Sequence, residues 1–173
     1  MHVAYKVFPL KNPTPIFPEQ NCTWTPILNI NVMYKHARSN RFEAVVDSGS
    51  PWCLFHADIG RHIGIKITDG IEEALGGVIG GAVGKMYFHK VKLCFMSGMT
   101  EIMAGFSEHL SVAGILGRSG FFNDYKITFD PSNTPPGMDL ERFYRAYGPG
   151  NGHSANCCGT FGRMRTGAKV EGR

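Results

Sequence analysis

The sequence has 173 residues, a net charge of +4 and 43% hydrophobic residues, a composition typical of one globular domain. Residues 1–138 carry 12 Lys and Arg against 11 Asp and Glu, and residues 139–173 carry 6 against 3. The main body is therefore nearly neutral and shows no basic stripe for nucleic acid. No apolar run is long enough to span a bilayer, and the first residues lack the pattern of a signal peptide.

The cysteine content predicts a reducing compartment. The five cysteines are an odd number, and they occur at no spacing typical of a metal site. We therefore expect reduced thiols, a cytoplasmic location, and no metal or cofactor.

In chain order, the pattern predicts short strands separated by turns rich in glycine and proline. Such a pattern indicates an all-β barrel or sandwich with very little helix. The predicted strands are Val3–Phe8, Trp24–Met33, Phe42–Asp47, Val91–Phe95, Ile102–Phe106 and Tyr125–Asp130. The other predicted elements are a hairpin turn over Lys35–Arg41, a short helix over Ala57–Ile63 and a helical turn over Arg118–Asp124.

The composition changes after about Pro131. Leu140–Tyr147 is predicted to form one or two helical turns, and Gly148–Arg173 is Gly-rich and basic. We expect a first domain over residues 1–138, with a flexible tail over 139–173. Cys157-Cys158 in this tail are read either as a metal or redox site or, as we favour, as incidental cysteines of an exposed tail.

Several common catalytic motifs are excluded by spacing. A phosphate-binding loop ending at Gly84-Lys85 would need Gly in place of Ile79 and Ser or Thr in place of Met86. A serine hydrolase elbow needs Gly-x-Ser-x-Gly, which none of Ser48, Ser50 and Ser119 provides. His56 and His62 are spaced as in no common zinc motif.

Asp47 is the strongest candidate for chemistry. The apolar run Ala44–Val46 leads directly into this carboxylate, and the small residues Ser48, Gly49 and Ser50 follow it. Small residues let backbone amides and hydroxyls approach a carboxylate and hold it ionised and fixed in direction. The alternative reading is a plain Asp-Ser-Gly turn between two strands.

Three segments in this order resemble the retropepsin-like aspartic peptidases of the cellular, bacterial type. They are Val45–Ser50, the glycine-rich Gly76–Gly84, and Ala113–Arg118, which contains Ile-Leu-Gly-Arg. The closing Phe121–Asp130 is similar to the last helix and strand of that family, and the resemblance covers roughly residues 1–131. It implies a retropepsin-like β-barrel with one short helix, whose half-site is completed by homodimerisation.

The resemblance also implies a role for each matching residue. Asp47 would be catalytic, Ser48 would lock the two active-site loops together across the dimer, Gly49 would leave room for substrate, and Ser50 would hydrogen-bond the carboxylate. Ile115, Leu116 and Gly117 would support that loop, and Gly77, Val78, Ile79, Gly80 and Gly81 would form a mobile flap that binds substrate. Viral members carry an Asp where this chain has Pro51, so the partner of Arg118 is not identified from the sequence.

The function implied is peptide-bond hydrolysis by two aspartates that share one proton. Asp-Ser-Gly occurs once in the sequence, so two chains must meet to form the site. The expected partners are a polypeptide substrate and a second copy of the chain. A non-catalytic retropepsin-like module for dimerisation or peptide binding is the alternative, and an unrelated β-barrel binding protein is the third possibility.

Overall fold

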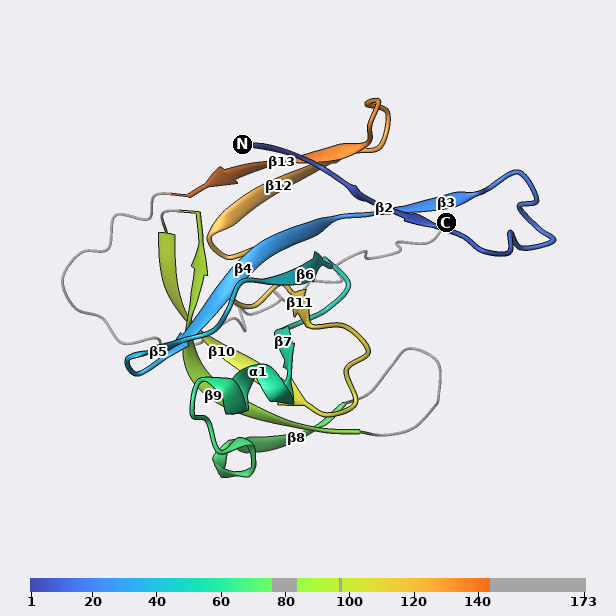
Figure 1. Ribbon diagram of the computed structural model, residues 1–173. Helices are drawn as coiled ribbons and strands as arrows, with labels where there is room; N and C mark the ends of the chain where they lie inside the picture. The colour runs from blue at the N-terminus through green and yellow to red at the C-terminus, as the bar shows by residue number, and fades with distance from the viewer. Residues whose placement is uncertain (76–83, 97, 144–173) are drawn as a thin grey trace, which may run out of the picture.

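The computed structural model describes residues 1–75, 84–96 and 98–143 (Figure 1). Strands account for nearly all regular structure in these ranges, and α1 is their one α-helix, so the predicted all-β class is confirmed. The elements are β1 (His2–Ala4), β2 (Lys6–Pro9), β3 (Cys22–Thr25), β4 (Ile27–Tyr34), β5 (Ala37–Arg38), β6 (Phe42–Val46), β7 (Cys53–His56), α1 (Ala57–His62), η1 (Ile67–Asp69), β8 (Ile71–Leu75), β9 (Gly84–Phe95), β10 (Gly98–Ser107), β11 (Gly114–Leu116), β12 (Tyr125–Asp130) and β13 (Gly137–Arg142).

Six strands close into a barrel. The large sheet has the order β5-β4-β6-β11-β7-β10-β9-β8, and an additional pairing of β4 with β9 joins its two halves. β11 runs parallel to β6 and β10 runs parallel to β7, while the other pairs in this sheet are antiparallel. β11 therefore lies between β6 and β7, the two strands on either side of Asp47 in the sequence.

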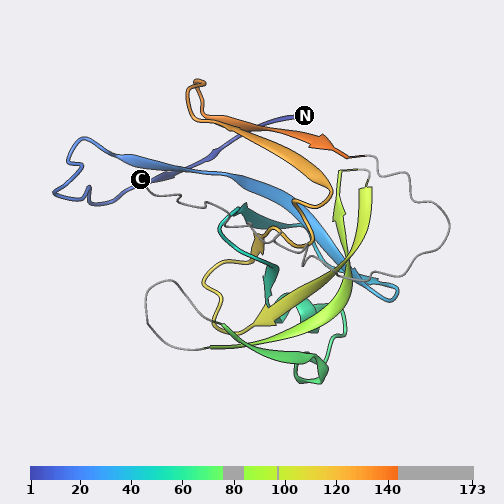
Figure 2. The ribbon, with the colours of Figure 1, turned by 180° about the vertical axis from the view of Figure 1, so that it is seen from behind.

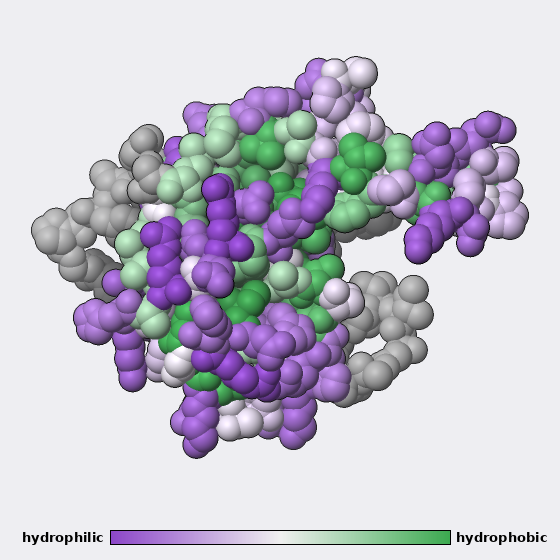
Figure 3. Space-filling view, in the orientation of Figure 1, coloured by the Kyte–Doolittle hydropathy of each residue, from purple (hydrophilic) through white to green (hydrophobic). Residues whose placement is uncertain are grey.

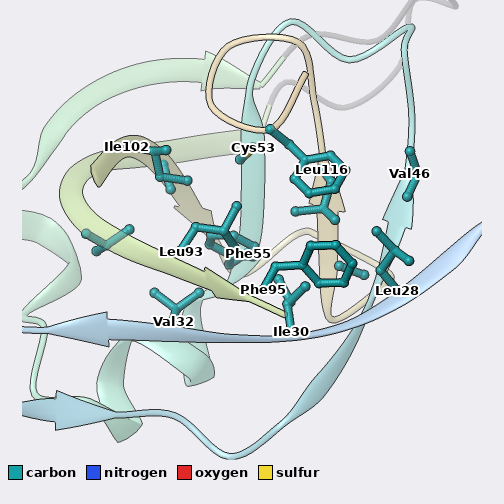
Figure 4. Packing of buried hydrophobic residues seen from close by; sticks show 14 of the residues in the cluster. Leu28, Ile30, Val32, Val46, Cys53, Phe55, Leu93, Phe95, Ile102 and Leu116 are labelled. Carbon is teal, nitrogen blue, oxygen red and sulfur yellow. The ribbon is translucent and has the colours of Figure 1, made fainter. Parts of the chain in front are cut away.

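Alternation of apolar and polar residues explains how β4 borders the core. Leu28, Ile30 and Val32 are buried, whereas Asn29 is exposed and Asn31 donates its side-chain amide to the Ser39 carbonyl. Successive side chains of a strand point to opposite faces, so one face of β4 is apolar. Figure 4 shows these three residues pointing toward Phe55, Leu93 and Phe95 from other barrel strands.

A second sheet lies over the barrel. It has three strands in the order β1-β13-β12, and Met138 and Leu140 of β13 are buried in the same core as the barrel residues. β2 and β3 form a separate two-stranded ribbon that projects from the barrel (Figures 1 and 2). Figure 3 shows hydrophobic residues exposed among hydrophilic ones over the three-stranded sheet and at the base of this ribbon.

The structure corrects two predictions and confirms another. The predicted helix at Ala57–Ile63 is present as α1. The predicted helical turn at Arg118–Asp124 is a series of turns without helix, even though the Tyr125 amide donates to the Phe121 carbonyl at 3.2 Å. The predicted helix from Leu140 is wrong for residues 140–142, because β13 continues to Arg142 and pairs with β12.

β13 also crosses the domain boundary predicted between residues 138 and 139. Gly148–Arg173, with Cys157-Cys158, lies outside the described residues. No helix within the described ranges is long and apolar enough to cross a membrane.

Candidate active site

Asp47 lies at the point where a central barrel strand ends. β6 is paired with β4 on one side and with β11 on the other, and its alternate residues Ala44 and Val46 are buried in the core. Asp47 follows directly and is half-buried. Its amide donates to the Leu116 carbonyl at 3.1 Å, which keeps the backbone of Asp47 attached to the sheet.

The side chain of Asp47 is oriented by the turn that follows it. The Gly49 amide donates to Asp47 Oδ1 at 2.8 Å, and the Ser50 amide donates to the Asp47 carbonyl at 3.3 Å. A Cβ on Gly49 would lie 3.1 Å from the same Oδ1, so glycine leaves room for the carboxylate. An amide that bonds one carboxylate oxygen fixes the direction in which the other oxygen points.

Ser50 differs from its predicted role. Its hydroxyl donates to the Trp52 carbonyl at 2.8 Å. A hydroxyl has one proton to donate, so the predicted donation from Ser50 to the Asp47 carboxylate is absent in this chain. Ser50 instead holds the turn between Asp47 and β7.

Arg118 has a partner that the sequence did not reveal. Its Nη1 donates to the Ser48 carbonyl at 2.9 Å, and its backbone amide donates to the Ser50 carbonyl at 3.0 Å. The guanidinium therefore contacts the backbone of the Asp47 loop, and Pro51 supplies no carboxylate for it. The Ser48 side chain is exposed.

The segment Ile115–Gly117 lies beside this loop. Ile115 and Leu116 are paired with Val45 and Val46 of β6, and Ile115 is also paired with Leu54 of β7. Gly117 follows at the crossing of the chain over the Asp47 loop. A Cβ at Gly117 would overlap the Trp52 carbonyl oxygen and would lie 2.8 Å from the Ser50 carbonyl oxygen. Only glycine permits this approach of two backbones.

Cys53 begins β7 directly after the loop, and its burial argues against a role in the chemistry. The side chain is fully buried, and burial raises the pKa of the thiol to about 11. The reactive thiolate is thus a negligible fraction near neutral pH. Asp47, rather than Cys53, is the group available for chemistry.

The two histidines close in sequence have a structural explanation. His56 caps α1 by accepting a hydrogen bond from the Asp58 amide at 3.3 Å. His62 belongs to the last turn of the same helix. Among the described residues, no group of three His, Cys, Asp or Glu side chains is arranged to hold a metal ion.

The predicted flap residues Gly77, Val78, Ile79, Gly80 and Gly81 lie outside the described residues. The two strands that flank them, β8 and β9, pair in antiparallel fashion, with Glu73 opposite Met86 and Leu75 opposite Gly84.

Trp52 was not singled out from the sequence, yet it ends the Asp47 loop and forms a parallel bridge with Ser119. The available signal was an aromatic residue two positions after the last of the small residues Ser48, Gly49 and Ser50.

No protein-family model and no curated protein matches the sequence. The solved structures that are similar to it include two proteases. A retropepsin-like aspartic protease from Rickettsia conorii has 14% identity and a TM-score of 0.48, with 65% of this chain and 88% of that chain covered. EIAV protease in complex with the inhibitor HBY-793 has 14% identity and a TM-score of 0.40, with 54% of this chain and 82% of that chain covered. What this chain does has to be inferred from its own residues around Asp47.

Proposed function

We propose that this chain is one subunit of a homodimeric aspartic endopeptidase, in which a pair of Asp47 carboxylates, one from each chain, activates a water molecule for hydrolysis of a peptide bond. One observation carries the proposal. Asp47 stands at the end of a buried strand, with one carboxylate oxygen held by the Gly49 amide at 2.8 Å in a turn built of small residues. A carboxylate fixed in this way is positioned for chemistry rather than solvated at random.

The chemistry requires two such groups. In a pair of carboxylates that share one proton, the ionised partner takes a proton from water while the protonated partner donates to the carbonyl oxygen of the substrate. The water oxygen bonds to the carbonyl carbon. The C–N bond then breaks as the carboxyl group that took a proton from water gives it to the leaving amine, and the other carboxylate recovers a proton from a hydroxyl of the intermediate. The chain contains one Asp-Ser-Gly, so a two-fold symmetric pair of chains supplies the second carboxylate.

The remaining site residues have supporting roles in this proposal. Ser48 would bond across the two-fold axis to the partner loop, and Ile115–Gly117 would hold the Asp47 loop from below. Residues 77–81 would bond the main chain of the substrate. The three described cysteines, Cys22, Cys53 and Cys94, are free thiols, which suits the cytoplasmic location that we propose.

The test is the substitution Asp47→Asn, assayed with a mixed peptide library. Asparagine keeps the size of the side chain and can still accept from Gly49, but it cannot act as acid or base. We expect cleavage to be lost, the circular dichroism spectrum to be retained, and the wild-type rate to peak at mildly acidic pH, where the pair holds a single proton.

Asp69→Asn is the matched control, because it makes the same change at an aspartate that is exposed and pairs with Lys66. It should leave cleavage unchanged. Undiminished cleavage by Asp47→Asn would refute the assignment. Peptide binding without cleavage by the wild-type chain would favour a non-catalytic binding module.

A further inference from the structure

A cleft of about 460 Å³ lies on the flank of the barrel, beside the Asp47 loop. Its walls are Trp52, residues of β8, β9 and β10, and the turn over residues 119–124. Asp47 itself does not line it. The parallel bridge between Trp52 and Ser119 joins the cleft wall to the loop that carries Asp47.

One wall of the cleft is the edge of a strand. Four consecutive residues of β10, Thr100 to Met103, line the cleft. Because alternate side chains of a strand point to opposite faces, consecutive residues can line one cavity only where the cavity meets the strand at its edge.

The pairing of β10 agrees with this reading. β9 pairs with β10 from Gly98 to Phe106, but β7 pairs with β10 only from Ala104 onward. At Thr100–Met103, the edge of β10 that faces away from β9 has no strand partner among the described residues. Unpaired main-chain groups at a strand edge can bind an extended polypeptide by adding a strand.

The side walls of the cleft are apolar and exposed. The relative exposure is 37% for Trp52 and 44% for Met103. Trp52 is held by an edge-to-face contact with Phe88, whose ring centroid is 5.3 Å away. A fixed indole wall can cover the hydrocarbon part of a long side chain.

The cleft also carries an excess of negative charge. Its three carboxylates are Glu73, Glu101 and Asp124. Glu101 is paired with Lys90 at 2.5 Å, and Asp124 accepts the Thr100 hydroxyl at 2.5 Å. Among the described residues, neither Glu73 nor Asp124 has a cationic partner. A lysine or arginine side chain, with an apolar stem and a cationic head, matches both features of the cleft.

We propose that this cleft binds an extended basic segment of the polypeptide substrate, with its main chain along the free edge of β10, a Lys or Arg stem on Trp52, and the cationic head near Glu73 and Asp124. The identification of the occupant as substrate rests on the proposed peptidase function. Binding in the cleft would select polypeptides that carry a basic residue at a distance from the bond presented to Asp47.

The test measures binding without cleavage, in the full chain carrying Asp47→Asn and Trp24→Phe. The sequence has two tryptophans, so Trp52 becomes the sole tryptophan, and its emission is followed under excitation selective for tryptophan. The ligands are an eight-residue peptide of threonine and valine with one central arginine, and the same peptide with citrulline, which keeps the shape but lacks the charge. We expect saturable quenching of Trp52 and about threefold to tenfold weaker binding of the citrulline peptide.

Glu73→Gln should weaken binding of the arginine peptide by about the same factor and leave binding of the citrulline peptide unchanged. The effects of changing Glu73 and of changing the peptide are then not additive. Glu19→Gln is the matched control, since it removes the same charge from a residue outside the cleft. The proposal would be overturned by equal affinity for the two peptides. It would also be overturned if Glu73→Gln and Glu19→Gln lowered the affinity for the arginine peptide equally. Selective binding in a chain whose wild-type form cleaves nothing would retain the basic-peptide site and reject the peptidase function, whereas cleavage without selective binding would do the reverse.

Discussion

At the scale of single residues, Gly117 decides whether the candidate active-site loop can form. The backbone of Gly117 touches the backbone at Ser50 and Trp52, on the two sides of the turn that follows Asp47. Its carbonyl also accepts from the Phe121 amide at 3.3 Å, which links the loop to the closing turns. No flexible side chain is involved, so this contact cannot adjust to an added atom.

Gly117→Ala is predicted to be severely destabilising. The new Cβ would collide with two carbonyl groups that are held by hydrogen bonds from the Arg118 amide and the Ser50 hydroxyl, at a cost of about 3 kcal/mol or more in the free energy of unfolding. The measurement is urea unfolding followed by fluorescence.

Gly64→Ala is the control for this prediction. Gly64 has a φ of +81°, and nothing lies within 4 Å of the position of an added Cβ. Gly64→Ala should therefore lower the free energy of unfolding by about 1 kcal/mol, because alanine is strained in the left-handed backbone conformation. If Gly117→Ala and Gly64→Ala lowered the free energy of unfolding equally, the contact between Gly117 and the Trp52 carbonyl would not be tight.

At the scale of elements, β13 attaches the end of the described chain to its beginning and to the core. β13 pairs with β1 on one side and β12 on the other. Leu140 is 3% exposed within the main core cluster, and its amide donates to the Met1 carbonyl at 2.8 Å. The chain up to Arg142 is therefore part of the folded unit.

Leu140→Ala should lower the free energy of unfolding by about 2–5 kcal/mol, because it leaves a cavity between the second sheet and the barrel. Its neighbour Glu141 is exposed on the same strand, and Glu141→Ala should change stability by no more than about 0.5 kcal/mol. Thermal unfolding of both variants checks this. A negligible effect of Leu140→Ala would place residue 140 in a dispensable tail, as the sequence had suggested.

At the scale of the whole molecule, the proposed active site is half of a site. Asp47 has its supporting contacts within one chain: the Gly49 amide, the Leu116 carbonyl and the Arg118 guanidinium on the adjacent Ser48. The second carboxylate has no candidate in the same loop or in its pairing strands. The proposed activity therefore depends on association of two chains.

Mixing chains tests this dependence. Wild-type chains unfolded and refolded with an equal amount of Asp47→Asn chains should retain about half the activity of the wild-type chains refolded alone, because random pairing leaves about one quarter of the dimers with two aspartates. Peptide cleavage at equal wild-type input is the measurement. Addition of Asp69→Asn chains, which keep Asp47, should instead about double the activity. Activity that is unaffected by the Asp47→Asn chains would mean that each chain acts alone.

The sequence predicted those features of the structure that depend on residues close to one another in the chain. The alternation in β4, the short helix α1 and the emergence of Asp47 from an apolar strand follow from the spacing of apolar residues and from turn-forming Ser and Gly. The failures at local scale were Arg118–Asp124 and Leu140–Arg142. Both segments contain side chains compatible with helix, and pairing or packing with distant residues decided their backbone instead.

The contacts that shape the candidate sites were decided by tertiary structure alone. Arg118 meets the Ser48 carbonyl because β11 is inserted between β6 and β7, and nothing near Arg118 in the sequence specifies a backbone acceptor 70 residues away. The cleft that we propose as a site for a basic peptide likewise depends on distant pairing, because β7 begins opposite Ala104 and the preceding edge of β10 has no strand partner in the described ranges. A residue's type and neighbours set what it can bond, but the register between distant strands sets which partner it reaches.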